Sequence, residues 1–148
     1  MKPPIFAGQG TADTPLQYLH RARMFRNAAG PLADYVNGEP FSPRYALITH
    51  AIELALKAFV RHNVANGNPI AKEPRQHDLS GWYRSALQCG LQDDPAISQS
   101  IEILNELHST HYSRYPQHRV GPIPAGEAIL DSTVNHLIDT FTRMISPR

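Results

Sequence analysis

The sequence predicts an all-α fold, an up-and-down bundle of four to five helices that forms a single domain over residues 1–148. A polar capping residue followed by proline, a common helix start, occurs three times: Thr14-Pro15, Ser42-Pro43 and Asp94-Pro95. Glycines follow periodic segments, as is typical of helix ends: Gly38, Gly67 and Gly90. No run of alternating apolar and polar residues enriched in β-branched side chains indicates a strand.

The first helix is expected over about residues 15–36, where apolar residues repeat every three or four positions. This stripe comprises Tyr18, Ala22, Phe25, Ala29, Leu32 and Val36. Gly30-Pro31 interrupts it, and we expect a kink or break there because proline removes a backbone hydrogen bond and clashes with the preceding turn. Three arginines fall mainly off the stripe and are interpreted as a solvated face: Arg21, Arg23 and Arg26.

The second helix is expected over about residues 43–63 and carries the widest apolar arc of the chain. That width predicts a central helix, with Ile52 and Phe59 in the core. Glu53 and Lys57 lie four residues apart in the favourable order, which predicts an exposed ion pair worth about 0.3 kcal/mol.

The remaining helices are expected over about residues 78–89, 95–113 and 125–145, after a loop over residues 64–77. The fourth helix has the apolar stripe Ile97, Ile101 and Leu104. In the third helix, Trp82 and Tyr83 could stack on a nucleobase, but an aromatic pair on so short a helix is interpreted as core.

Composition excludes several classes of protein. The one cysteine, Cys89, cannot form an internal disulfide or a thiolate zinc cluster, and is interpreted as a small packing residue. No apolar run is long enough for a membrane span or a signal peptide, so no membrane association and a cytoplasmic location are expected. Phosphate-loop, dinucleotide-binding and Gly-x-Ser-x-Gly motifs are missing, and no cofactor is expected.

The formal net charge is only +1, but residues 107–126, called the basic stretch below, contain no Asp or Glu. The stretch holds two arginines and three histidines: Arg114, Arg119, His108, His111 and His118. A local excess of cations attracts anions, above all phosphates, so we expect a binding surface centred on Arg114. The competing interpretation is that Arg114 caps the C-terminal end of the fourth helix, where a cation meets the helix dipole.

Several segments together resemble the HEPN (higher eukaryotes and prokaryotes nucleotide-binding) domain family. Residues 45–59 resemble the family's second helix, in which an aromatic and small residues lead into Glu, an apolar run and Lys-Ala. His77-Asp78-Leu79 is similar to the Lys-x-His-x-Leu entry to the third helix, although Arg75 replaces the usual nearby lysine. Arg114-Tyr115-Pro116 is similar to the Arg-Tyr-Pro exit of the fourth helix. The elements follow the family's order over roughly residues 14–142.

The resemblance implies a helical bundle, often a homodimer, with one of two activities. Some HEPN domains are metal-independent RNases of toxin–antitoxin or defence systems. Others are inactive and bind a nucleotide, RNA, or a protein partner such as a nucleotidyltransferase or an antitoxin. Active members carry Arg, four to six residues, then His near the end of the fourth helix.

In this chain the matching arginine is Arg114, but only three residues separate it from His118, and Pro116 lies between them. An arginine can stabilise phosphorane charge while a histidine moves a proton, so Arg114, His118 and His111 are candidates for catalysis. The residue pair Arg44 and His50 has the required spacing but lies at the start of the second helix, and is discounted.

Two interpretations remain open for His108 and His111, which continue the stripe of the fourth helix. They are either inward-facing, hydrogen-bonded core histidines or part of a basic cleft beside Arg114. A shared metal ion is a third interpretation, but no complete ligand motif accompanies them, so no metal is assigned. The candidates for contacting nucleotide or RNA are His108, His111, Arg114, Tyr115, His118 and Arg119.

Three functions therefore stand as hypotheses. The leading one is a HEPN-like domain without established catalysis that binds a nucleotide, RNA or a partner protein through the surface near Arg114. The second is a divergent metal-independent RNase of toxin–antitoxin or defence type. The third is a purely structural module that serves dimerisation.

Overall fold

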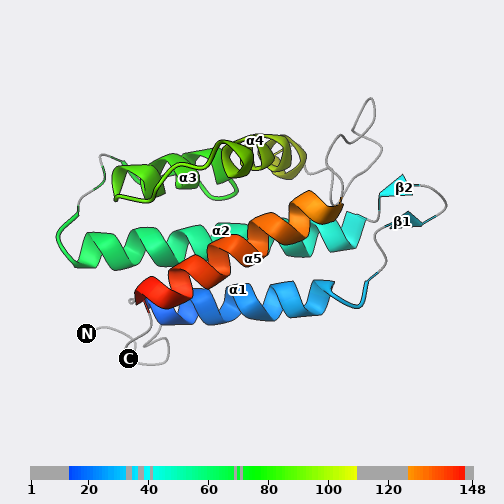
Figure 1. Cartoon of the computed structure of the whole chain (residues 1–148), viewed down its shortest axis with the longest axis horizontal. Helices are drawn as coiled ribbons and strands as arrows, with labels where there is room; N and C mark the ends of the chain where they lie inside the picture. The colour runs from blue at the N-terminus through cyan, green and yellow to red at the C-terminus, as the bar shows by residue number, and fades with distance from the viewer. Residues whose placement is uncertain are drawn as a thin grey trace, which may run out of the picture.

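The computed structural model describes residues 14–32, 35–36, 39–40, 42–68, 70, 72–109 and 127–145. Its helices are α1 (Pro15–Ala29), α2 (Ser42–Ala65), α3 (Leu79–Gln88), α4 (Pro95–Ser109) and α5 (Glu127–Ile145). They pack into a bundle, which confirms the predicted all-α fold class (Figure 1). The expected extensions of the fourth helix to residue 113 and of the fifth from residue 125 lie outside the described residues.

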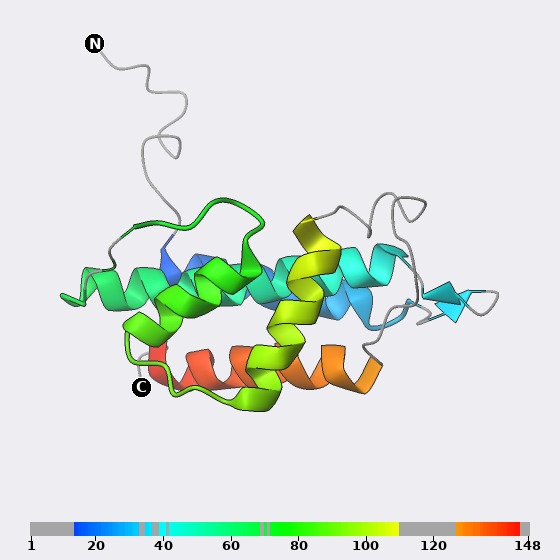
Figure 2. The same cartoon turned by 90° about the horizontal axis from the view of Figure 1, so that it is seen from above.

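Helix α2 is central, as its apolar arc predicts. It contacts α1, α3, α4 and α5. Helices α1 and α2 lie side by side and run in opposite directions, α5 crosses both, and α3 and α4 cover the side of α2 that faces away from α1 (Figure 1). Figure 2 shows α4 crossing α2 and α5 at a steep angle. No helix in the described part of the chain is both long and apolar enough to cross a membrane.

The predicted helix starts follow from their caps. Thr14 forms a capping box with Gln17: its Oγ1 accepts from the Gln17 N–H at 3.1 Å, and its own N–H donates to Gln17 Oε1 at 2.8 Å. At the start of α4, Asp94 Oδ1 accepts from the Ala96 N–H at 2.9 Å. Both starts are therefore confirmed at the positions that the proline motifs predict.

The first helix ends earlier than predicted, at Ala29 and not at Val36. The Gly30 N–H still donates to the carbonyl of Arg26 at 3.2 Å, but Pro31 has no N–H to continue the helix. The interruption at Gly30-Pro31 is therefore a complete end.

Beyond this end the chain forms a short hairpin, which the sequence analysis did not anticipate. Strand β1 (Tyr35–Val36) pairs in antiparallel fashion with β2 (Glu39–Pro40). The signal in the sequence is Asn37-Gly38, a dipeptide favoured in hairpin turns, although only two paired residues flank it on each side.

Two of the three glycines predicted to end helices do so with a left-handed backbone. Gly67 follows α2 with φ of +94°, and Gly90 follows α3 with φ of +105°. Gly38 lies outside the described residues.

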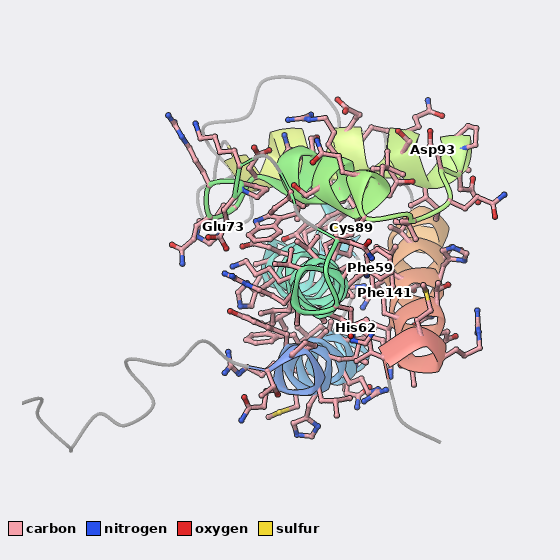
Figure 3. The ribbon with its side chains drawn as sticks, turned by 90° about the vertical axis from the view of Figure 1, so that its left-hand side faces the viewer. Phe59, His62, Glu73, Cys89, Asp93 and Phe141 are labelled. Atoms are coloured by element: carbon pink, nitrogen blue, oxygen red, sulfur yellow. The ribbon has the colours of Figure 1, made fainter. Side chains whose placement is uncertain are left out.

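The core lies between α2 and its neighbours. Ile52 and Phe59 are fully buried, as predicted, and Phe59 stacks on Phe141 of α5 with ring centroids 4.7 Å apart (Figure 3). Cys89 is buried, and burial raises the pKa of its thiol, which agrees with its interpretation as a packing residue.

The interpretation of the α1 arginines as a solvated face is wrong for Arg23. This side chain lies between α1 and α5, where its Nη2 donates to Thr142 Oγ1 at 2.6 Å. Arg26 reaches the same helix, with Nη1 3.5 Å from Asn135 Oδ1. The stripe pattern does not reveal these contacts because α5 packs against the edge of the apolar face.

Candidate functional site

The surface predicted around Arg114 is not among the described residues. Of its residues, only His108 lies in a described element, in the last turns of α4, and the placement of its side chain is not described. The others lie outside the described residues: His111, Arg114, Tyr115, His118 and Arg119. Their roles in binding or catalysis, and the inward orientation of His108 and His111, remain predictions.

Glu53 is the most deeply buried charged residue described on α2. Its side chain is 1% exposed, and Lys57 Nζ lies 2.9 Å from its Oε2. The prediction of an exposed pair is therefore wrong, because α3 and the segment before it cover this face of α2. A buried carboxylate is expensive unless it is paired, so Lys57 offsets a large desolvation cost.

His77 completes the surroundings of this carboxylate. Its Nδ1 lies 3.3 Å from Glu53 Oε1, and its backbone N–H donates to Glu53 Oε2 at 3.3 Å. The φ angle of His77 is +67°, which is costly for a residue with a side chain. Glu53 thus holds residues 72–78 against α2 through both the ring and the backbone of His77.

Helix α3 packs over the cluster formed by Glu53, Lys57 and His77. The ammonium of Lys57 lies 5.4 Å from the centroid of the Trp82 ring, within the range of a cation–π contact. Trp82 is 2% exposed, so its interpretation as core is correct. The structure thereby brings together Glu53, Lys57 and His77, which belong to the motifs that resemble the HEPN family.

The first turn of α3 depends on a close approach at Gly81. Asp78 is the N-cap, and its Oδ1 accepts from the Gly81 N–H at 2.9 Å. A Cβ at Gly81 would lie 2.4 Å from Asp78 Oδ2 and 3.1 Å from Pro74 Cβ. Glycine is therefore required for residues 72–78 to pack this tightly on α3.

A pocket of about 290 Å³ opens between residues 72–78 and the outer face of α3. Three cations line it, Lys72, Arg75 and Arg84, together with the polar side chains of Ser85 and Gln88. No histidine is among the described residues that line the pocket.

The carboxylates that line the pocket, Glu73 and Asp78, are both engaged. Glu73 forms an ion pair with Arg61 of α2, and lies on the side of α3 away from α5 (Figure 3). Asp78 caps α3 through the Gly81 N–H. Within the described residues, the pocket's three cations have no carboxylate partner, so the pocket is suited to an anion.

One hydrogen bond joins α4 to the first turn of α3. Asn105 of α4 accepts from the Ser80 N–H in the first turn of α3, at 3.4 Å. The basic stretch begins two residues after Asn105, at residue 107, and most of it lies outside the described residues.

The discounted pair on α2 has structural roles. Arg44 is 4% exposed; its Nη1 donates to the Ala29 carbonyl at 2.8 Å and its Nη2 to Asp131 Oδ1 at 2.6 Å. It therefore ties the C-terminal end of α1 to α5, where a cation also meets the helix dipole. The His50 ring packs edge-on against Phe25, with centroids 4.4 Å apart.

Sequence reasoning missed the pocket cations. Lys72 and Arg84 lie twelve residues apart, with Glu73 and Asp78 between them, so no local excess of charge appears. The signal that was available is Arg75, which stands where the resembled family has a lysine near its His-x-Leu entry.

The described residues contain no group of three or more metal-ligating side chains placed to hold an ion. No protein-family model matches the chain, and neither a curated protein nor a solved structure matches it.

Proposed function

We propose that this chain is a HEPN-like binding domain that holds a phosphate-bearing ligand, a nucleotide or RNA, in the pocket between residues 72–78 and α3. One observation carries the proposal: Lys72, Arg75 and Arg84 line one pocket while both of its carboxylates are engaged. Guanidinium groups match phosphate oxygens in a two-pronged geometry, and an ammonium adds a compact charge.

The basic stretch supports the same ligand class. It begins at residue 107, two residues after Asn105 of α4, and holds two arginines and three histidines without an acidic residue. A chain of phosphates is a suitable ligand for such a surface, because each neutralised phosphate releases counterions.

Binding fits the pocket better than catalysis does. Proton transfer to a ribose hydroxyl needs a titratable group within reach, and histidine is the usual one. The nearest described histidine, His77, instead contacts the buried Glu53. The alternative is a divergent RNase that uses Arg114 with His118 or His111, and a direct assay of RNA cleavage tests it.

The test is fluorescence anisotropy of a labelled single-stranded RNA, with wild-type protein and the variant Arg75→Ala/Arg84→Ala, over a series of salt concentrations. Wild-type affinity should fall steeply with salt. The double variant should bind more weakly, and its slope of log affinity against log salt should be shallower by about 1.4, or ~0.7 for each lost phosphate contact.

Arg143→Ala is the matched control, because Arg143 is an exposed cation on α5 that does not line the pocket. It should bind RNA like the wild type. Equal affinity and slope for the wild type and the double variant would refute a role for the pocket. Failure of the wild type to bind RNA or any nucleotide at low salt would leave the structural module as the remaining function.

A further inference from the structure

None of the described residues that line the pocket is aromatic. Proteins that recognise unpaired bases commonly stack them on aromatic rings or read their hydrogen-bonding edges. The described residues of this pocket thus offer cations for a phosphate but no aromatic ring for a base.

The two aromatic residues of α3 are held elsewhere. Trp82 is 2% exposed, and Lys57 lies over its ring at 5.4 Å. Tyr83 is 4% exposed, and its hydroxyl donates to Asp93 Oδ1 at 3.0 Å. Neither ring can serve as a stacking platform without breaking these contacts and exposing core surface.

The pocket is also small. Its volume of about 290 Å³ lies at the lower limit of the roughly 300–1,000 Å³ found for pockets that enclose a drug-sized ligand. A phosphate with its sugar fits within such a space. The hydroxyl of Ser85 and the amide of Gln88 can then hydrogen-bond sugar hydroxyls, beside the cations that hold the phosphate.

We infer that the pocket recognises the sugar-phosphate part of its ligand and does not discriminate between bases. This inference rests on the proposed function and narrows it: the ligand class is a ribose phosphate, whether free, in a mononucleotide or in an RNA chain. The base stays outside the pocket and contributes little to affinity.

Isothermal titration calorimetry of the whole chain at low salt tests this inference. The ligands are ribose 5-phosphate, the four ribonucleoside 5′-monophosphates, and adenosine as the unphosphorylated control. A base that stacked on the protein would strengthen binding by roughly 5- to 150-fold. We expect the five phosphate compounds to differ by less than about fivefold, and adenosine not to bind.

Arg84→Ala should weaken binding of all five phosphate compounds by the same factor, whereas Arg143→Ala should leave each affinity unchanged. Circular dichroism establishes that both variants are folded.

Four results would overturn the inference. Mononucleotides that bind while ribose 5-phosphate does not, or a strong preference for one base, would leave the proposed function standing but place the base in contact with protein. Adenosine binding as tightly as its monophosphate would show that the pocket does not recognise the phosphate. If folded protein bound none of the phosphate compounds and no RNA, the proposed function would fail together with the inference.

Discussion

Glu53 carries its charge almost entirely out of water, so its neighbours decide whether it stabilises or destabilises the fold. Lys57 supplies a 2.9 Å ion pair, and His77 supplies a backbone donor and a ring contact at 3.3 Å. Removing one partner from such a cluster leaves an uncompensated charge, whereas replacing both partners by apolar groups costs much less.

Glu53→Ala should therefore lower the free energy of unfolding by about 3–5 kcal/mol, measured by urea denaturation. The matched variant is the pair Glu53→Gln/Lys57→Met, which keeps the volume but removes both charges. We expect it to recover most of the loss. Equal destabilisation by the two variants would show that the charges are not coupled.

Tyr83 gives a pH dependence of known sign. Burial, together with the adjacent Asp93 carboxylate, raises the pKa of Tyr83 to about 12. In the unfolded chain the phenol titrates near about 10. Its neutral form thus stabilises the fold fully below pH ~10, and this contribution is lost as pH rises from about 10 to about 12.

Denaturation between pH 9 and pH 12 should show the stability advantage of the wild type over Tyr83→Phe shrinking across this window. Comparison with Tyr83→Phe removes the effect of the other groups that titrate there. An advantage that stays constant with pH would mean that the Tyr83 hydroxyl has an ordinary pKa.

Helix α3 is the element on which the candidate site depends. Its first turn is capped by Asp78, and residues 72–78 pack against Gly81 so closely that a methyl group would lie 2.4 Å from the Asp78 carboxylate. Arg75 lies in this segment, between Pro74 and Asp78, so the packing of the segment against Gly81 also sets the position of Arg75.

Gly81→Ala should displace the Asp78 side chain, cost about 1 kcal/mol of helix capping, and weaken binding of ribose 5-phosphate. Gly67→Ala is the control that separates an effect on stability from an effect on binding. It strains a φ of +94° in open space, outside the residues that line the pocket. Calorimetry should show reduced affinity for the first variant alone; equal loss in both would attribute the effect to stability.

The elements differ in how far the sequence predicts them. The ends of α2 and α3 follow from local signals within one or two residues, because caps and glycines act on adjacent backbone. The apolar spacing continues past Pro31 and predicts a helix to Val36, but of the two outcomes expected at Gly30-Pro31, a kink or a break, the structure has the break, and α1 ends at Ala29.

The candidate site was not predictable in the same way. Burial of Glu53 depends on α3 packing over α2, and the pocket joins Lys72 and Arg84 across a turn between two elements. Such tertiary placement has no periodic signature in the chain. The basic stretch, by contrast, is contiguous, which is why composition alone reveals it.

The whole molecule depends on α2, which touches each of the other four described helices. Phe59 is fully buried and stacks on Phe141, so this one ring joins the central helix to α5 (Figure 3). Helix α5, the last in the sequence, is thereby packed on α2, so segments far apart in the sequence share one core.

Phe59→Ala should lower the free energy of unfolding by about 3–5 kcal/mol in chemical denaturation, through lost burial and a cavity. Val64→Ala is the control on the same helix; Val64 is 42% exposed, and its loss should stay within about 0.5 kcal/mol. A Phe59→Ala loss as small as that of the control would contradict the central position of α2.

The expected homodimer and protein partners stay predictions of the HEPN resemblance, and the expected cytoplasmic location stays a prediction from composition. The proposed function requires that a phosphate-bearing ligand binds in the pocket between residues 72–78 and α3. Chemical-shift mapping of the isotopically labelled chain, titrated with ribose 5-phosphate, tests it most directly. We predict that the largest amide shifts fall within residues 72–88 and disappear in Arg75→Ala/Arg84→Ala. Shifts confined to residues 107–126, or no saturable shift in folded protein, would contradict the claim.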